Sequence, residues 1–410
     1  MSRIDELIAE LCPDGVVFRP IWQLTTWDKK FNAVERFKQP EVRKYRYLLA
    51  NEMTPFVVEG GDVKLLTTND SNLWTTEAVV GGPIHEGEII AIPWGGNAIV
   101  QYFNGRFVTS DNRIAVANDP NELSMKFLYY FIQSNLGTLA SFYRGSGIKH
   151  PSMAKVLDWR IPVPPLEVQR EIVRVLDQFT QLEAELEAEL EARRRQYEHY
   201  RQLAMSFDNS VPRVALGDVA EVRSGWGFPN AHQGQEEGEY PFYKVSDMNL
   251  LGNETVMSIA NHYVSAEVAK KLGVRPAPAG TVIFPKIGAA VATNKKRVLS
   301  VPSAYDNNVM GLVPTERVSS RFLYHWMQTF DLSRLANDSG AVPSIRKTEA
   351  EQVLIPLPDL DTQRKVADLL DKFDALVNDL NVGLPAELAA RRKQYEYYRD
   401  NLLTFEEAAA

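Results

Sequence analysis

The sequence predicts an α+β protein in which two mixed α/β domains are separated by two long coiled-coil helices, with an internal repeat. Two pairs of motifs predict the repeat: RRRQYEHYR at 193–201 returns as RRKQYEYYR at 391–399, and IPVPPLEVQR at 161–170 returns as IPLPDLDTQR at 355–364. Apolar residues at helical spacing follow each proline-rich motif. Between the motifs, short β-branched runs bounded by Gly, Pro and Asn are typical of strands and turns.

The repeat divides the 410 residues into five segments. An N-terminal segment that completes the repeat is followed by a first globular domain, a central helix, a second globular domain, and a C-terminal helix with a tail. A chain of this length with 45% hydrophobic residues can bury the cores of two to three domains. The expected boundaries are 1–15, 16–160, 161–207, 208–354 and 355–410.

Each long helix is expected to begin after its proline-rich motif, because proline cannot occupy a helix interior. The first helix should run from about Leu166 to about Met205. Gly383 and Pro385 interrupt the second pattern and predict a kink or a restart there. The two motif pairs are offset by 194 and by 198 positions, so the second copy is four residues longer. Four residues are close to one helical turn of ~3.6, and we expect the insertion to preserve the buried face.

Apolar positions in both helices recur at spacings of three, four and seven, which indicates coiled-coil seams. The seams could pack on each other or bind partner subunits. Basic clusters at 193–195 and 391–393 are expected on solvated helix faces rather than on DNA, and the acidic run at 182–192 argues against the first helix gripping DNA. The predicted seam residues are Leu176, Phe179, Leu186, Leu190, Tyr197, Tyr200, Leu370, Phe373, Leu380, Leu388, Tyr395 and Tyr398.

The globular segments repeat more faintly, at an offset of 195. The run FLY at 127–129 returns at 322–324, and Gln133 returns as Gln328. Each segment is expected to form a mixed α/β domain that ends in one helix and a Gly/Ser loop. A shared frame with different contents suggests one task performed on two different targets.

The net charge of −8 argues against a nucleic-acid partner until its distribution is counted. Residues 16–160 carry a net charge of +2 and residues 208–354 a net charge of zero, so the acidic excess lies in the remaining segments. Cys12 is the only cysteine, which excludes an internal disulfide and fits a reducing cytoplasm. No signal segment or membrane-length apolar run is found, so we expect a cytoplasmic protein without a membrane partner.

The sequence holds no motif that predicts catalysis. It lacks the Gly-x-x-x-x-Gly-Lys-Ser/Thr phosphate loop, and GSGIKH at 145–150 is too short to replace it. It lacks the methyltransferase motifs Asn-Pro-Pro-Tyr/Phe and Asp-Pro-Pro-Tyr, and its six histidines and one cysteine have no metal-binding spacing. Asp361 and Lys365 lie at a helix start and do not indicate a nuclease centre. We expect a chain without catalytic, metal or cofactor sites.

The repeated motifs resemble the central and C-terminal conserved regions of specificity subunits of type I restriction-modification systems. The resemblance covers essentially the whole chain, including LIAELCPDGVVF at 7–18, GSGIK at 145–149 and YYRDNLLTF at 397–405. It implies a non-catalytic DNA-binding subunit in which two antiparallel helices, in a pseudo-twofold repeat, hold two target-recognition domains apart. Each domain would read one half of a bipartite, asymmetric target in double-stranded DNA.

The resemblance also implies partners. The helices would serve as a spacer and as the docking site for two methyltransferase subunits that hold S-adenosylmethionine, and restriction subunits that use ATP with Mg²⁺ could join them. A helix of about 39 residues spans roughly 58 Å at ~1.5 Å per residue. One DNA turn is ~34–36 Å, so tilted helices could hold two readers between one and two turns apart.

Base and phosphate contacts are expected from loop residues, with Lys and Arg on phosphates. Each candidate could equally be an ordinary solvated side chain, and the two Gly/Ser-plus-basic loops are favoured because they are equivalent across the repeat. In the first domain the candidates are Trp94, Asn97, Arg144, Ser146, Lys149 and His150. In the second domain they are Arg223, Lys286, Lys295, Lys296, Arg297, Ser344, Arg346 and Lys347.

Two other functions stay open from the residues alone. A DNA-independent scaffold could join proteins through its coiled coils and bind peptides through its domains. A standalone methyltransferase is disfavoured by the missing motifs. Salt separates the first alternative from DNA recognition, because the affinity of a phosphate-binding protein falls linearly in log salt.

Overall fold

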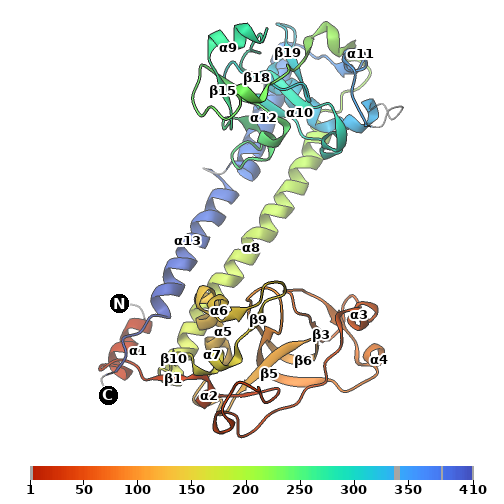
Figure 1. The fold of residues 1–410 in the computed structure, drawn as a ribbon. Helices are drawn as coiled ribbons and strands as arrows, with labels where there is room; N and C mark the ends of the chain where they lie inside the picture. The colour runs from red at the N-terminus through yellow and green to blue at the C-terminus, as the bar shows by residue number, and fades with distance from the viewer. Residues whose placement is uncertain (1–2, 337–341, 380–381, 409–410) are drawn as a thin grey trace. The chain divides into compact units, whose positions relative to one another are not determined.

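The computed structural model describes residues 3–336, 342–379 and 382–408. The chain forms two compact units: unit 1 comprises Met1–Leu182 with Arg391–Ala410, and unit 2 comprises Glu183–Ala390. The globular segments expected at 16–160 and 208–354 therefore each lie within one unit. Each unit also holds part of the first long helix and part of the C-terminal helical segment (Figure 1).

The core of unit 1 is a six-stranded mixed sheet in which only β3 and β6 pair in parallel. The β-branched run at 88–93 lies in strand β5 (His85–Pro93), and both faces of its second half are buried. Ile90 and Ile92 pack toward the helices, whereas Ile89 and Ala91 face a second, smaller cluster. The strand order is β2 (Thr25–Trp27), β7 (Asn112–Ala117), β5 (His85–Pro93), β6 (Gln101–Thr109), β3 (Val63–Leu66) and β4 (Trp74–Thr75).

The helices of unit 1 are mostly short, and a two-stranded hairpin is inserted among them. The hairpin joins β8 (Tyr143–Arg144) to β9 (His150–Pro151). Ser124 caps α5, where its side chain accepts a hydrogen bond from the backbone N–H of Phe127. The helices are α1 (Arg3–Leu11), α2 (Ile21–Leu24), α3 (Ala50–Met53), α4 (Glu77–Val80), α5 (Met125–Ser134), α6 (Leu136–Ser141) and α7 (Met153–Asp158).

Unit 2 contains a five-stranded sheet and a three-stranded sheet. The larger has the order β12 (Ala220–Ser224), β19 (Val309–Pro314), β16 (Val282–Pro285), β17 (Arg297–Leu299) and β14 (Val256–Met257). The smaller has the order β15 (Tyr263–Val264), β13 (Tyr240–Tyr243) and β18 (Ala304–Tyr305). The α-helices of the domain are α9 (Ala266–Lys271), α10 (Ser320–Thr329) and α11 (Lys347–Glu351).

The repeated Ile-Pro motif closes each domain where a long helix begins. In unit 1, β1 (Phe18–Pro20) pairs antiparallel with β10 (Arg160–Pro162), and in unit 2, β11 (Arg213–Ala215) pairs with β20 (Leu354–Pro356) in the same way. The isoleucine of each motif is fully buried. The extended conformation expected of these prolines is confirmed.

The first long helix, α8, runs from Leu166 to Ala204 over 39 residues, as predicted. The second copy is two helices, α12 (Leu360–Asn378) and α13 (Leu384–Leu402), so the expected interruption is confirmed. The four extra residues do not lengthen one continuous helix, because the chain leaves the helix between α12 and α13. Gly383 has φ +81°, and a Cβ there would lie 2.5 Å from the carbonyl oxygen of Leu376.

Within unit 2, α8 and α12 run antiparallel. The Arg194 side chain donates to the carbonyl of Val377 at 3.4 Å, and further along α8 the ring of Tyr197 stacks on that of Phe373 with centroids 6.4 Å apart. Tyr200 stacks on the same ring at 5.9 Å. As the residue number increases along α8, the number of its contact residue in α12 decreases, which is the antiparallel arrangement expected.

Most predicted seam residues pack as expected. Leu176, Leu190, Tyr197, Leu370 and Leu388 are buried. Three more, Leu186, Phe373 and Tyr395, are partly buried against the cores. In unit 1, Phe179 contacts the rings of Tyr395 and Tyr398 at 6.2 and 5.5 Å. Tyr200 and Tyr398 stack on their neighbours yet stay 43% and 41% exposed. Leu380 lies outside the described residues.

The C-terminal tail completes unit 1. The backbone N–H of Val16 donates to the carbonyl of Glu406 at 2.9 Å, and the N–H of Ala408 donates to the carbonyl of Val16 at 3.0 Å. Arg160 adds an ion pair to Glu407 at 2.5 Å. The closing residues, to which the sequence assigned no role, therefore pair with the N-terminal segment. In the part of the chain that the structure describes, no helix is long and apolar enough to cross a membrane.

Candidate nucleic-acid interface

The six candidates of the first domain lie together. In the hairpin 143–151, Arg144 pairs with His150 across the two strands. The backbone N–H of Gly96 donates to the carbonyl of Lys149 at 3.0 Å, and the His150 ring nitrogen Nδ1 lies 2.6 Å from the carbonyl of Trp94. These contacts dock the hairpin on the Trp94 loop, residues 93–98, which also carries Asn97.

The docked hairpin presents exposed polar side chains. Arg144, Ser146, Lys149 and His150 are exposed, as is Asn97. Gly145 has φ +138°, and a Cβ there would lie 2.6 Å from the carbonyl oxygen of Ile148, so the turn requires glycine. The hairpin therefore has a fixed main chain and exposed side chains, which is the arrangement expected of a group that reads a base edge or a phosphate.

Sequence reasoning missed a neighbouring feature, which we call the basic pocket. This cavity of about 520 Å³ lies beside the Trp94 loop. The Lys29 ammonium lies 5.3 Å from the centroid of the Trp94 ring, and the Arg113 guanidinium lies 4.7 Å from it. The hairpin, the Trp94 loop and the basic pocket thus form one continuous surface. The pocket is lined by Asp28, Lys29, Lys30, Val42, Lys44, Tyr45, Tyr47 and Arg113.

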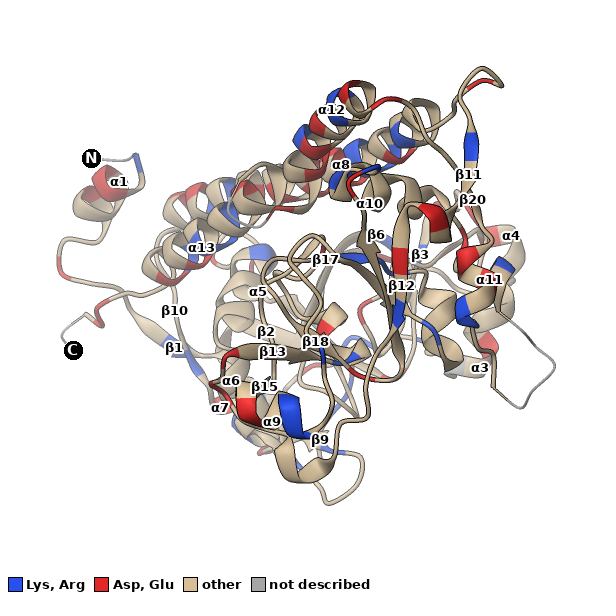
Figure 2. Ribbon diagram, turned by 90° about the horizontal axis from the view of Figure 1, so that it is seen from above, with Lys and Arg blue, Asp and Glu red and all other residues tan. Residues whose placement is uncertain are grey.

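A local charge count would have found this pocket. Residues 28–47 contain seven Lys or Arg against three Asp or Glu, a net charge of +4. The domain-wide value of +2 hides this segment, because the rest of residues 16–160 is slightly acidic. Figure 2 shows basic and acidic residues interspersed along the long helices α8, α12 and α13.

An ion pair forms the floor of the basic pocket. The Arg113 side chain is 3% exposed and bonds to Asp28 at 2.9 Å and also to Asp111. Burial raises the pKa of the Asp28 carboxyl, and the Arg113 charge opposes that rise. This pair is too buried to contact a large ligand, so we assign it a structural role in stabilising the pocket. The exposed cations around it are Lys29, Lys30 and Lys44.

The second domain repeats the frame of this surface with different residues. The backbone N–H of Lys286 donates to the backbone carbonyl of Asn308 at 2.9 Å, just as the N–H of Trp94 donates to the backbone carbonyl of Asp111. The backbone N–H of Gly288 donates to the carbonyl of Pro343 at 2.8 Å, just as the N–H of Gly96 donates to the carbonyl of Lys149. The two loops are therefore equivalent, as the sequence suggests.

Equivalent loops do not carry their lysines at equivalent positions. The bonded frame places Lys286 where the first domain has Trp94, and Pro343 where it has Lys149. Lys347 begins α11, the counterpart of Met153 at the start of α7. The two domains therefore share a main-chain frame and differ in the side chains that it presents.

Five candidates of the second domain lie around this frame. Lys286 bonds through its ammonium to the hydroxyl of Ser224 at 3.1 Å, and burial lowers its pKa. Ser344 forms a bridge with Ile287. Arg223 pairs with Glu221, a carboxylate whose pKa is lowered chiefly by Arg223 and also by the nearby Lys347. Arg346 and Lys347 are exposed, with ion pairs to Glu349 and Glu351 at 4.0 and 3.5 Å.

Three candidates make other contacts. Lys295 bonds to Asn249, and Arg297 donates to the carbonyls of Lys296 and Met248 at 2.8 and 3.2 Å. The prediction that Lys296 contacts DNA is wrong. Its side chain is fully buried and donates to the carbonyl of Phe330 at 2.6 Å and to Asn294 at 2.7 Å. Burial lowers the pKa of this ammonium to about 7, and the group stabilises the loop rather than a ligand.

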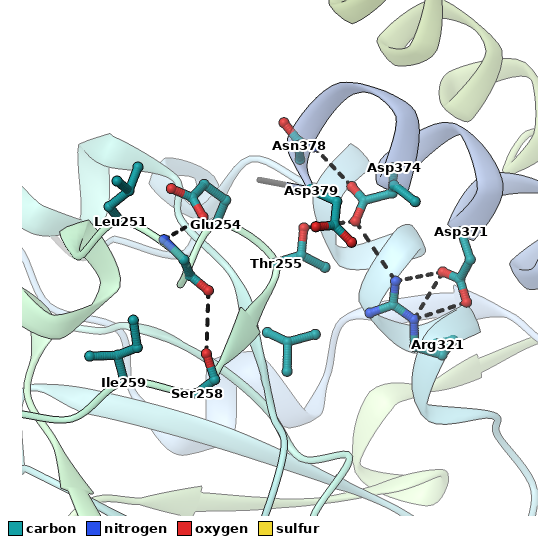
Figure 3. Close-up of a pocket in the computed structure, with 13 residues that line it drawn as sticks. Leu251, Glu254, Thr255, Ser258, Ile259, Arg321, Asp371, Asp374, Asn378 and Asp379 are labelled. Atoms are coloured by element: carbon teal, nitrogen blue, oxygen red, sulfur yellow. Dashed lines mark hydrogen bonds and ion pairs between the residues drawn. The ribbon is translucent and has the colours of Figure 1, made fainter. Parts of the chain in front are cut away.

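A cleft of about 610 Å³ in unit 2 has the opposite charge character (Figure 3). Asp371, Asp374 and Glu254 line it, and these carboxylates would repel phosphate. Arg321 bonds to Asp371 through two nitrogens, the closest at 2.5 Å, and Thr255 donates to Asp374 at 2.7 Å. We therefore assign these groups to the attachment of the domain to α12.

Unit 1 has the counterpart of this attachment. On α5, Lys126 pairs with Asp177 of α8 at 2.7 Å, and the hydroxyl of Tyr130 donates to the same carboxylate at 2.6 Å. In unit 2, His325 takes the place of Tyr130, with its Nε2 at 2.6 Å from Asp371. In each unit, therefore, one aspartate of a long helix bonds to two side chains of the domain: a basic side chain, and a tyrosine or histidine ring.

No group of three or more side chains suited to hold a metal ion is found among residues 3–336, 342–379 and 382–408. The candidate surface of unit 1 instead offers ammonium groups, aromatic faces and a fixed hairpin. These are suited to binding a polyanion that also carries apolar surface.

Comparison with known proteins identifies the family. A model of the family described as "Type I restriction modification DNA specificity domain" matches residues 51–192 and 211–390. The specificity subunit of the Escherichia coli type I restriction enzyme EcoR124I/EcoR124II is 30% identical over 317 residues, 74% of this chain and 76% of that protein. A putative type I restriction enzyme specificity subunit of Haemophilus influenzae is 30% identical over 347 residues, 80% of this chain and 85% of that protein.

Solved structures show the same fold. The S subunit of a type I restriction-modification system from M. genitalium aligns with a TM-score of 0.57 at 17% identity, over 95% of this chain and 96% of that chain. A chain from a study of complex assembly in the type I system aligns with a TM-score of 0.58 at 16% identity, over 95% and 98%. The chain therefore belongs to the family of type I restriction-modification specificity subunits.

Proposed function

We propose that this chain is the sequence-specific DNA-recognition subunit of a type I restriction-modification complex, acts in the cytoplasm, and is not itself an enzyme. The observation that carries the proposal is the continuous surface of unit 1, where the hairpin 143–151, the Trp94 loop and the basic pocket meet. Ammonium groups suit phosphates, and the exposed hairpin side chains suit base edges. The names of its relatives, which are restriction enzyme specificity subunits, support the same function.

Each domain would read one half of a bipartite, asymmetric target. The shared frame with unlike side chains supports this: Trp94 is replaced by Lys286, and Lys149 by Pro343. The basic segment 28–47 corresponds at an offset of 195 to residues 223–242, which hold one arginine against three glutamates. Two readers that differ this much at equivalent positions would recognise different sequences.

The long helices would hold the readers apart and bind two methyltransferase subunits. Exposed apolar side chains on α8, α12 and α13 support docking, because a bound partner would remove this apolar surface from water. Among them are Leu182, Leu203, Leu369 and Tyr397, which are 48%, 56%, 52% and 67% exposed. S-adenosylmethionine would belong to the methyltransferase subunits, and ATP with Mg²⁺ to any restriction subunit.

A domain exchange tests the proposal. Residues 208–354 are replaced by the second domain of another member of the family, and the methylome of cells that carry the chimera with methyltransferase subunits is sequenced. One half of the methylated site should change while the other half and the spacer persist. A change in both halves, or in neither, would defeat the model of two readers. A peptide-binding scaffold predicts no dependence of methylation on this chain.

A further inference from the structure

The basic pocket combines two kinds of surface. Its walls are the apolar Val42 and the rings of Tyr45 and Tyr47, and its floor is the Asp28–Arg113 pair, whose charges offset each other. The exposed lysines Lys29, Lys30 and Lys44 also line it. A ligand that suits the pocket therefore has a largely apolar centre and negative groups on its sides.

The main chain holds these residues in place. The backbone N–H of Arg43 donates to the carbonyl of Trp27 at 3.0 Å, and that of Leu48 donates to Thr109 at 2.9 Å, which fixes the extended segment 43–48 at both ends. The ring of Tyr45 packs edge-on against His85, with centroids 5.0 Å apart. Tyr47, by contrast, is 57% exposed. The pocket is thus preformed, with one aromatic face free for a ligand.

We propose that the basic pocket is a cradle for the sugar–phosphate backbone of one DNA strand, and that it fixes the first domain on its half-site without reading sequence. A deoxyribose would lie against Tyr47 and Val42, and the phosphates on its two sides would pair with Lys29, Lys30 and Lys44. This inference rests on the proposed DNA recognition and adds a division of labour to it. Backbone contacts would come from segment 28–47, and base contacts from the hairpin 143–151 and the Trp94 loop.

A stacked base could enter the pocket only by leaving the duplex, at a cost of a few kcal/mol. Deoxyribose and phosphate form the outer surface of a duplex and need no such step. Three lysines beside one free tyrosine face also match the alternation of phosphate and sugar along a strand better than they match a single base. The corresponding acidic segment of the second domain indicates that this cradle belongs to the first reader alone.

The test uses the full chain and several duplexes of unrelated sequence, because a backbone contact does not depend on the target. Affinity is measured by fluorescence anisotropy across a salt series. The triple variant Lys29→Ala, Lys30→Ala, Lys44→Ala should flatten the slope of log affinity against log salt by about 2 to 3, and lower affinity near 0.1 M salt by roughly 10²-fold. The loss should be the same on every duplex. Lys155→Ala is the matched control, since it removes an exposed lysine of the same domain outside the pocket.

Tyr47→Ala should lower affinity by about three- to tenfold with the salt slope unchanged, because the lost contact is apolar. Tyr47→Phe should retain wild-type affinity. A triple variant with the wild-type slope would overturn the cradle, and so would a loss confined to one duplex sequence. A rise in 2-aminopurine fluorescence that depends on Tyr47 would also overturn it, since that rise reports an unstacked base. If the wild-type chain binds duplexes without salt dependence, the proposed function fails first, and the cradle with it.

Discussion

Gln169 and Gln363 make the same set of hydrogen bonds in the two units. The side-chain oxygen of Gln169 accepts from the backbone N–H of Ser124 at 2.9 Å, and that of Gln363 accepts from the N–H of Ser319 at 2.8 Å. Each amide nitrogen then donates to two carbonyls, those of Glu122 and Pro164 in unit 1, and those of Arg317 and Pro358 in unit 2. Both glutamines are fully buried.

This relationship explains why the motif ending in Gln-Arg is repeated. The glutamine ties the start of a long helix to the turn before α5 or α10. The aspartate eight residues later, Asp177 or Asp371, ties the same helix to the first two turns of α5 or α10. Two points of attachment on one helix fix the rotation of the domain about that helix. The motif is therefore repeated because each copy attaches one domain to its long helix, and a shared catalytic or binding role is not needed to explain it.

The first prediction tests the glutamine. Gln169→Glu keeps the shape of the side chain but replaces its amide nitrogen by a carboxylate oxygen. The hydrogen bonds to the carbonyls of Glu122 and Pro164 are then lost, and the negative carboxylate faces the negative ends of the two carbonyl dipoles. We expect a loss of about 2–4 kcal/mol in the free energy of unfolding, measured by urea denaturation. Gln202→Ala, at an exposed position of the same helix, should change it by less than about 0.5 kcal/mol. Equal effects of the two changes would contradict the attachment.

The second prediction concerns acid. His325 is buried among Asp371, Asp374, Arg321 and Tyr197, and its pKa is lowered first by burial and also by the Arg321 charge. The folded state therefore favours neutral imidazole, whereas the unfolded state takes up a proton near pH 6.5. Since the unfolded state binds more protons below that pH, stability should be full above about pH 6.5 and fall as the solution becomes more acidic.

This acid sensitivity is measured by comparing wild type with His325→Asn in urea at pH 8.0 and pH 5.5. Wild type should lose more unfolding free energy over this interval than the variant does. A Tyr130→Phe variant, altered at the equivalent site of unit 1 where no imidazole is present, should keep the wild-type pH dependence. Identical pH dependence in wild type and His325→Asn would show that this imidazole does not couple folding to pH.

The third prediction separates reading from packing. Lys149 is exposed on the hairpin, whereas Leu190 of α8 is 8% exposed in the core of unit 2. Lys149→Ala should leave assembly with methyltransferase subunits intact and weaken methylation at the target by an amount equivalent to ~1–3 kcal/mol. Leu190→Asp should disrupt assembly, because it buries an unpaired charge. Mass photometry measures assembly, and methylation is measured on a cognate duplex. Loss of assembly in Lys149→Ala would defeat the assignment of the hairpin to DNA.

Features set by local sequence were predictable. Prolines fix where β10 and β20 end and where the long helices begin, and Gly383 marks the interruption before α13. The Gly/Ser loop at 145–149 was also expected, and it forms the turn of the hairpin 143–151. In each case the determinant is a residue type with a narrow backbone preference, so no knowledge of distant contacts is required.

Features set by tertiary contacts were not predictable. The run Lys295-Lys296-Arg297 looks solvated in sequence, yet Lys296 is buried, because the acceptor carbonyl of Phe330 lies 34 residues away along the chain. No role was expected for Asp177 and Asp371, because their partners Lys126 and Arg321 lie 51 and 50 residues away along the chain. The basic pocket is assembled from segment 28–47 and Arg113 of β7, and only the fold brings these together.

The last prediction concerns the length of α8. Its residues 182–190 read LEAELEAEL, a four-residue period close to the ~3.6 residues of a helical turn. Inserting one further Leu-Glu-Ala-Glu near Glu187 should keep Leu190 and Tyr197 close to their buried face. At ~1.5 Å of rise per residue against ~3.4 Å per base pair, the unread gap of the target should lengthen by about one to two base pairs. Inserting two residues instead should rotate the following seam by about half a turn, expose Leu190 and Tyr197, and lower both stability and methylation. Methylome sequencing of cells that carry each variant reports the spacer directly. Equal tolerance of both insertions, or an unchanged spacer after the four-residue insertion, would mean that α8 does not set the distance between the half-sites.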